Sequence, residues 1–136
     1  MTKEKYDKHG VGEFGEKAAA KYLKKKKYKI IAKNKKAGRS EIDIIALNKD
    51  TLVFVEVKTR TYDPDKTYYT RPADAVNKSK TSYLIRGADR FCAENGTKFS
   101  RYFKRFDVIE VYLEQIGNRR KVNRILHFEN AVSRNK

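Results

Sequence analysis

The chain has 136 residues, a length that fits one compact domain, and 39% of them are apolar, which is enough to form a folded core. No run approaches the roughly 18 apolar residues of a membrane span, and the single cysteine, Cys92, excludes an intrachain disulfide. The 33 Lys and Arg residues outnumber the 17 Asp and Glu residues, giving a net charge of +16 that attracts polyanions. Nucleic acid is therefore the expected partner, with an acidic protein or an acidic membrane as weaker alternatives.

The first half of the chain predicts a helix and three strands. Residues 1–10 form a polar tail without the apolar run of a signal peptide, so a cytoplasmic location is expected. Helical spacing over residues 11–26 is carried by Phe14, Ala18, Tyr22 and Leu23. The apolar run 28–32 predicts a strand, and 33–40 a basic loop. Residues 41–60, EIDIIALNKDTLVFVEVKTR, predict a hairpin that turns at Lys49 and Asp50.

The second half predicts a loop, a long helix and one or two strands. Residues 61–71 are polar and rich in tyrosine, and Pro72 suits the first turn of a helix that extends to about residue 94. Strands are predicted over 106–113 and 124–128. This order describes a mixed sheet flanked by helices, in one α/β or α+β domain over residues 11–130, followed by a basic tail over 131–136.

The charges of the hairpin are expected to gather at its open end. With a two-residue turn, Asp43 lies opposite Glu56, and Glu41 lies opposite Lys58. Alternation then gives one strand face made only of apolar side chains, from Ile42, Ile44, Ala46, Val53, Val55 and Val57. The other face is apolar near the turn, with Ile45, Leu47, Leu52 and Phe54. The four charged residues lie at the open end of this second face.

Two carboxylates directly opposite each other repel, so something must offset that cost. Mg²⁺ or Mn²⁺ would do so, because hard divalent cations prefer oxygen ligands that converge on one point. In the alternative interpretation, Lys58 pairs with Glu41 and Glu56 in a surface ion network. A register slip of one residue would separate the charges altogether. The residues alone leave both interpretations open.

A known family shares these motifs. SEIDIIA followed by VFVEVKTR resembles the D…ExK core of the restriction-endonuclease-like PD-(D/E)xK nucleases. Together with GEFGEKAAAKYL, AVNKSK and RFDVIEV, the chain resembles the YraN family of small bacterial proteins over residues 12–111. That family is similar to archaeal Holliday junction resolvases. The resemblance implies a single restriction-endonuclease-like domain with a central mixed β-sheet and helices on both sides.

The resemblance also implies the residues of a site. Glu16, Asp43 and Glu56 match the acidic positions, and Lys58 matches the catalytic lysine. Asp43, Glu56, the backbone carbonyl of Val57 and Glu16 would hold Mg²⁺ or Mn²⁺. Three further matches are less direct: Glu41 is the acid that precedes the aspartate, Lys80 is a basic position on the second helix, and Arg105 and Asp107 form an RFD signature whose role is structural or functional. The family usually has glycine where this chain has Ser40.

The implied activity is that of a magnesium-dependent endonuclease that hydrolyses phosphodiester bonds in DNA, including branched or structured DNA. Resolvase-like enzymes cut two symmetric strands as dimers, so the resemblance is compatible with a homodimer. The alternatives are a non-catalytic nucleic-acid-binding protein with a nuclease-like fold, and a structural protein that docks partners. Nucleic acid would be contacted by Glu41, Lys33, Lys35, Lys36, Arg39, Arg60, Arg71 and Lys80, while Tyr62, Tyr68 and Tyr69 stack on bases or pack their loop.

Overall fold

The computed structural model describes residues 8–66 and 78–131. The elements follow in the order α1 (Lys8–Lys25), β1 (Lys29–Ala37), β2 (Ser40–Asn48), β3 (Thr51–Thr61), α2 (Lys78–Glu94), β4 (Phe103–Ile116) and β5 (Arg119–Phe128). Within the described residues the five strands form one sheet in the order β1-β2-β3-β4-β5, in which only β3 and β4 run parallel. The expected α/β domain with a mixed sheet and flanking helices is confirmed.

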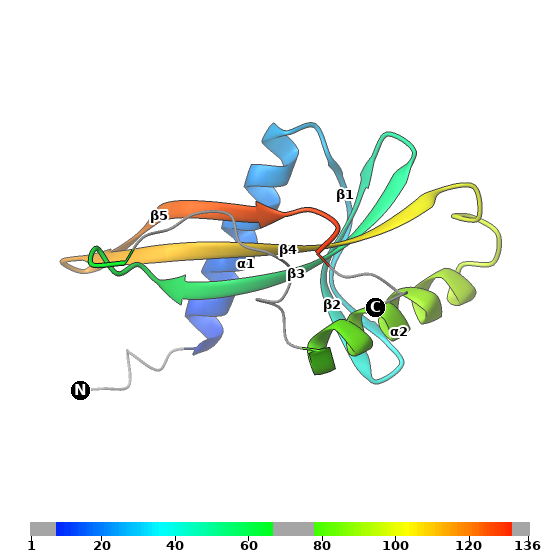
Figure 1. The fold of residues 1–136 in the computed structure, drawn as a ribbon, viewed down its shortest axis with the longest axis horizontal. Helices are drawn as coiled ribbons and strands as arrows, with labels where there is room; N and C mark the ends of the chain where they lie inside the picture. The colour runs from blue at the N-terminus through cyan, green and yellow to red at the C-terminus, as the bar shows by residue number, and fades with distance from the viewer. Residues whose placement is uncertain (1–7, 67–77, 132–136) are drawn as a thin grey trace.

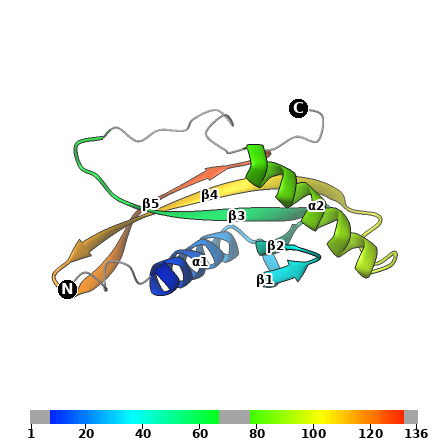
Figure 2. The same ribbon diagram turned by 90° about the horizontal axis from the view of Figure 1, so that it is seen from below.

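The sheet separates two apolar cores, one under each helix. In Figure 1, α1 passes behind the sheet and α2 lies in front of it, and Figure 2 shows the two helices from the side. Ala19 and Leu23 of α1 share one core with Val55 of β3, whereas Phe91 of α2 packs against Phe54 in the other core. Phe54 also stacks on Phe106 of the neighbouring strand, with 5.7 Å between ring centroids. Burial on both faces therefore explains why β3 has so continuous an apolar sequence.

Helix α1 ends in a left-handed cap formed by a lysine. Lys27 has a φ of 74°. Its N–H donates to the carbonyl of Lys24 at 2.9 Å, and the N–H of Tyr28 donates to the carbonyl of Leu23 at 3.0 Å. These two bonds form a Schellman motif, in which glycine is the more usual residue. The cap turns the chain directly into β1.

The predicted basic loop over residues 33–40 is wrong except at Gly38 and Arg39. Strand β1 continues to Ala37 and pairs with β2 as far as Ala37–Ser40, so that only Gly38 and Arg39 form the turn. The lysines in this segment are exposed. Because β1 is an edge strand, its side chains can reach solvent while its backbone pairs on one side only, and a lysine-rich sequence is therefore compatible with a strand.

The remaining elements agree with the predictions, but the strands are longer. The hairpin turns at Lys49 and Asp50 as expected, with a φ of 58° at Lys49. Strand β4 contains the predicted segment 106–113, and β5 contains 124–128. Pro72, at the predicted start of the second helix, lies outside the described residues, as do Tyr68, Tyr69 and Arg71. Neither of the two described helices is long and apolar enough to cross a bilayer.

Candidate active site at the separation of β2 and β3

The candidate site begins where β2 and β3 move apart. Their antiparallel pairing runs from Asn48–Thr51 to Ile44–Val55 and then stops. Beyond that point the Oδ2 atom of Asp43 accepts a hydrogen bond from the backbone N–H of Val57 at 2.8 Å. The predicted register is thus confirmed over the apolar half of the hairpin. The expected direct pairs of Asp43 with Glu56 and of Glu41 with Lys58 do not form, because a carboxylate takes the place of the backbone acceptor.

Both neighbouring strands are irregular at this position. On β1, Lys33 pairs with Ile44 and Lys35 pairs with Ile42, whereas Asn34, which lies between them opposite Asp43, is not part of the ladder. Asn34 has a left-handed φ of 51°. On β2, Ile42 and Ile45 belong to the core under α2, whereas Ile44 belongs to the core under α1. The predicted common face for Ile42 and Ile44 is therefore wrong. The break in alternation allows the Asp43 side chain to reach the backbone of β3.

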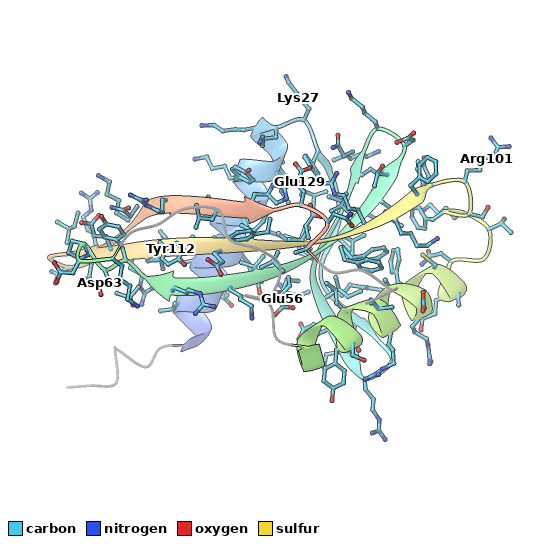
Figure 3. The ribbon with its side chains drawn as sticks, in the orientation of Figure 1. Lys27, Glu56, Asp63, Arg101, Tyr112 and Glu129 are labelled. Atoms are coloured by element: carbon cyan, nitrogen blue, oxygen red, sulfur yellow. The ribbon has the colours of Figure 1, made fainter. Side chains whose placement is uncertain are left out.

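Glu56 lies on the α2 side of the sheet, in a cleft. Figure 3 shows it beside the amino-terminal end of α2. The cleft is bounded by the β1–β2 turn, by β3 and by α2, and is lined by Ala37, Gly38, Arg39, Ser40, Glu41, Glu56, Tyr83, Leu84, Arg86, Asp89 and Arg90. Glu41 and Glu56 thus share a surface even though they do not face each other across a ladder. Arginines and carboxylates together make this cleft suited to a phosphate ester and a cation.

Glu16 approaches from the other helix. The preceding Gly15 lies so close to β3 that an added Cβ would overlap the hydroxyl of Thr59, and this contact fixes the first turns of α1 against the strand. Burial raises the pKa of the Glu16 carboxyl, a hydrogen bond from Asn34 opposes the rise, and the charge of Glu41 adds to it. Glu16 therefore lies within electrostatic range of Glu41 and beside the irregular residue of β1.

The three predicted metal-binding acids surround the end of the β2–β3 ladder without closing on one point. Across residues 8–66 and 78–131, no three His, Cys, Asp or Glu side chains are placed so that they could hold a metal ion. Magnesium sites often need only one or two carboxylates, with water and substrate phosphate completing the octahedron. Asp43 and Glu56, 13 positions apart in sequence and joined through the Val57 amide, are compatible with such a site.

Lys58 lies two residues beyond Glu56 and is half-buried. In the described part of the chain its side chain forms no hydrogen bond or ion pair. Glu110 lies beside it in register on the parallel strand β4 and is almost fully buried. Glu110 accepts a 2.7 Å hydrogen bond from the Tyr112 hydroxyl, and Arg60 Nε lies 3.7 Å from its other oxygen. A buried carboxyl group therefore lies beside the lysine on the neighbouring strand, and the sequence predictions did not include Glu110.

The residues predicted to bind nucleic acid take several positions. Arg39 and Glu41 line the cleft, and Arg60 lies at the end of β3. The three lysines of β1, Lys33, Lys35 and Lys36, are exposed on the edge strand. Lys80 is in the first turn of α2, and the structure does not describe its side chain; Arg71 lies outside the described residues altogether. Among the predicted basic residues, Arg39 is the one that lines the cleft together with Glu41 and Glu56, as far as the structure describes them.

Ser40, the position at which the resemblance noted above would give glycine, does not have a left-handed φ. Its hydroxyl donates to the backbone carbonyl of Tyr83 at 3.2 Å, and its Cβ would lie 3.1 Å from a Cβ added to Gly87. The glycine that permits the close approach is therefore on α2 rather than on β2. As a result, the residue before Glu41 is attached to the helix that forms the opposite wall of the cleft.

Among the cleft residues that were not predicted from the sequence are Tyr83, Arg86 and Arg90 of α2. They occupy positions i, i+3 and i+7 of α2 and so share one helical face. That spacing is visible in the sequence and is the signal that was available. What the sequence did not show is that this face is turned toward Glu56, since the orientation depends on Gly87 packing against β2.

The RFD signature has a structural role, on the face of the sheet opposite the cleft. Asp107 is fully buried and accepts hydrogen bonds from Arg105 Nε at 2.9 Å and from the Asn130 N–H at 2.9 Å, with His127 Nε2 at 2.8 Å. Burial alone would raise the pKa of Asp107, but these donors outweigh it and lower the pKa. His127 in turn lies 3.2 Å from the Tyr22 hydroxyl, which connects β4 and β5 to α1.

Comparison with known proteins finds one consistent family. The model of the uncharacterised protein family UPF0102 matches residues 15–111, a segment that contains all four predicted catalytic residues. The chain is 45% identical over 124 residues to a UPF0102 protein of Caldanaerobacter subterraneus subsp. tengcongensis, which covers 90% of this chain and 97% of the relative. It is 41% identical over 121 residues to a UPF0102 protein of Alkaliphilus oremlandii, covering 89% and 96%.

Proposed function

The chain belongs to the uncharacterised protein family UPF0102, the YraN family, and on this premise we propose that it is a metal-dependent endonuclease that hydrolyses phosphodiester bonds in DNA. One observation carries the proposal. The Asp43 carboxylate accepts a hydrogen bond from the backbone N–H of Val57, the residue between Glu56 and Lys58. The aspartate and the ExK segment of the motif are therefore adjacent in space. A pure binding protein gains nothing from carboxylates in a groove that must accept phosphate.

The donor set suits a hard divalent cation. Asp43, Glu56, the backbone carbonyl of Val57 and Glu16 would hold Mg²⁺ or Mn²⁺, since all four supply oxygen. When bound, such an ion polarises the scissile phosphate and lowers the pKa of its water. Lys58 would orient that water and stabilise the negative charge that develops on the phosphate. The half-buried position of Lys58 suits this role, because an ammonium group removed from bulk water interacts more strongly with charge nearby.

The positive surface would supply affinity for the substrate. With a net charge of +16, the protein attracts DNA at long range, and Arg39 in the cleft is placed to contact a phosphate near the acids. Such contacts position the nucleic acid without reading its sequence. Branched or otherwise structured DNA is the favoured substrate, and a homodimer would allow two symmetric strands to be cut.

Cleavage of a small substrate panel tests the proposal. The panel contains duplex, single-stranded, flap and four-way-junction DNA, each incubated with Mg²⁺, Mn²⁺ or EDTA. The proteins compared are the parent, the site variants Glu56→Ala and Asp43→Asn, and the control Asp65→Asn. Asp65 is an exposed carboxylate outside the cleft. We expect metal-dependent cutting by the parent and the control, and a loss of at least about a hundredfold in both site variants. Cutting by Asp43→Asn at the parental rate would refute the assignment.

One observation favours a second candidate, a non-catalytic nucleic-acid-binding protein with a nuclease-like fold. In the described residues the acids do not form a group of three ready to hold an ion. Calorimetric titration with Mn²⁺ separates the two candidates. Binding that is lost in Glu56→Ala supports the nuclease, whereas salt-sensitive DNA binding without any metal binding or cutting supports the second candidate.

A further inference from the structure

An exposed aromatic side chain lines the cleft that contains Glu41 and Glu56. Tyr83 of α2 is 52% exposed and lines the cleft together with Glu41 and Glu56. The other two exposed large apolar side chains of the described residues, Phe103 and Ile116, do not line it. Removing a large ring from water is favourable, so the exposed ring of Tyr83, beside a candidate active site, is available for contact with a ligand.

A guanidinium group lies over one face of the ring and forms a layered pair with it. The Cζ atom of Arg86 lies 5.0 Å from the centroid of the Tyr83 ring. The same guanidinium donates from Nη1 to the Ser82 hydroxyl at 2.9 Å, which holds it in place. Tyrosine rings and arginine planes are among the side-chain surfaces on which unpaired bases stack in nucleic-acid-binding proteins. Tyr83 and Arg86 together, called the stacking platform below, have the chemistry for such a contact.

The stacking platform is attached rigidly to the strand that carries the acids. Ser40 donates its hydroxyl hydrogen bond to the carbonyl of Tyr83 itself, and Gly87 allows α2 to pack directly on Ser40 and Ile42. The platform therefore keeps its position relative to Glu41, the residue after Ser40. Arg39 and Arg90 line the same cleft and supply positive charge for the phosphates on either side of a stacked base.

We propose that the stacking platform holds an unpaired base of a nucleic acid whose adjacent phosphate would bind in the cleft beside Glu41 and Glu56. In a continuous duplex both faces of every base are covered by its neighbours, so stacking on Tyr83 requires a nucleotide that has left the helix. The substrate class is therefore nucleic acid with a single-stranded portion, such as a flap or an open junction. The inference rests on the proposed function in that it takes nucleic acid as the ligand.

A fluorescent base tests the stacking platform directly. We would place 2-aminopurine at the unpaired position of a flap DNA and, for comparison, inside a continuous duplex of the same sequence. Binding is measured in EDTA, so that it does not depend on cutting. The variants are Tyr83→Leu, which removes the ring; Tyr83→Phe, which keeps it; and Phe103→Leu, which removes an aromatic ring that is 69% exposed outside the cleft. Circular dichroism verifies that each variant is folded.

We expect Tyr83→Leu to bind the flap about tenfold more weakly than the parent, since stacking contributes that much per base, and to bind the duplex unchanged. Tyr83→Phe and Phe103→Leu should bind both DNAs like the parent. The 2-aminopurine fluorescence should be quenched on binding by the parent and by Tyr83→Phe, but not by Tyr83→Leu. The inference would be overturned if Tyr83→Leu weakened binding of flap and duplex equally, or weakened neither. It would also be overturned if Tyr83→Leu weakened only the binding of a protein partner.

The result also separates this inference from the proposed function. If the parent cuts nothing in Mg²⁺ or Mn²⁺ while Tyr83→Leu still loses flap binding selectively, the stacking platform is supported and the nuclease fails. If the parent cuts DNA but Tyr83→Leu binds and quenches like the parent, the nuclease stands and the stacking platform is refuted.

Discussion

Asp43 and Val57 are joined by a 2.8 Å hydrogen bond from the backbone N–H of β3 to the carboxylate of β2, at the place where the two strands cease to pair. The bond satisfies an amide that would otherwise lack a partner on that side. It also holds the acid of β2 within reach of the backbone that carries Glu56 and Lys58. One contact thus serves both the fold and the candidate site.

Two substitutions of Asp43 should separate these roles. Asparagine keeps an oxygen that can accept the Val57 hydrogen bond but removes the charge, so Asp43→Asn should change the free energy of unfolding by less than about 1 kcal/mol while abolishing cleavage. Asp43→Ala also removes the acceptor and should destabilise the protein by about 1–3 kcal/mol. Urea denaturation compared with the cleavage panel gives both quantities. Equal stability of the two variants would show that the bond contributes little to the fold.

Glu16 should oppose folding at neutral pH. Because burial raises its pKa, the folded protein holds this proton more tightly than the unfolded chain does, and ionisation therefore destabilises the fold. Glu16→Gln should increase the free energy of unfolding at pH 7 by a few tenths of a kcal/mol, a small gain because the carboxyl is largely screened by solvent. The gain should vanish below pH of about 4, where the carboxyl is protonated in both states. Urea midpoints in EDTA at the two pH values measure it, and a less stable variant at pH 7 would contradict it.

Gly15 should not tolerate a side chain. An alanine there overlaps the Thr59 hydroxyl, and forcing α1 away from β3 should lower the free energy of unfolding by about 1–3 kcal/mol. Gly12 in the same helix has nothing within 4 Å of an added Cβ, so Gly12→Ala is the matched control and should stabilise the protein by up to about 1 kcal/mol.

The same pair of residues allows a double-mutant test. Thr59→Ala removes the hydroxyl that Gly15→Ala would meet, so the two changes together should be less destabilising than their separate effects predict. Thermal or urea denaturation of the four proteins measures the coupling. Additive effects would mean that α1 moves away from β3 rather than pressing on Thr59.

Asp107 should dominate the stability of the β4–β5 half. It is fully buried and accepts from Arg105, His127 and the Asn130 N–H, so Asp107→Asn should lower the free energy of unfolding by about 3–5 kcal/mol. Glu114→Gln, on the same strand and bonded only to Asn123 at 2.9 Å among the contacts observed, is the control and should change it by less than about 1 kcal/mol.

Because the pKa of Asp107 is lowered in the folded protein, the contribution of Asp107 to the free energy of unfolding depends on pH. Its stabilisation is complete above the unfolded value of about 3.9 and is lost as the pH falls through the lower folded value. The parent should therefore lose stability on acidification below pH 4 more steeply than Asp107→Asn. Parallel acid-denaturation curves for the two proteins would contradict this.

Arg39 should contact phosphate. In EDTA, Arg39→Ala should weaken DNA binding on all sequences alike and reduce the slope of log affinity against log salt by about one. Arg101 is an equally exposed arginine beyond the carboxyl end of α2 (Figure 3), and Arg101→Ala should leave the slope unchanged. An equal change in both slopes would mean that the arginines act through net charge rather than through a defined contact.

Local patterns in the sequence determined the elements and part of the pairing. Period-2 alternation and a two-residue turn were enough for the hairpin register from Ile44 to Val55, because the successive pairs from Ile44–Val55 to Leu47–Leu52 place apolar side chains on alternate faces of the sheet. The order of helices and strands was enough for a mixed sheet with flanking helices. The motif predicts that Glu16, Asp43, Glu56 and Lys58 form one site, and the family to which the chain belongs is shown by the family model and the relatives.

Only the tertiary structure decided how the charged residues are arranged. The ladder stops at Asp43 because a side chain, not a backbone carbonyl, takes the Val57 hydrogen bond, and no sequence period reports such an exchange. Tyr83 and Arg86 are brought to the cleft by Gly87 packing on β2, and Glu110 is brought beside Lys58 by the parallel pairing of β3 with β4. These contacts join residues far apart in the chain, and so they depend on packing between elements rather than on the local preferences that a sequence pattern records.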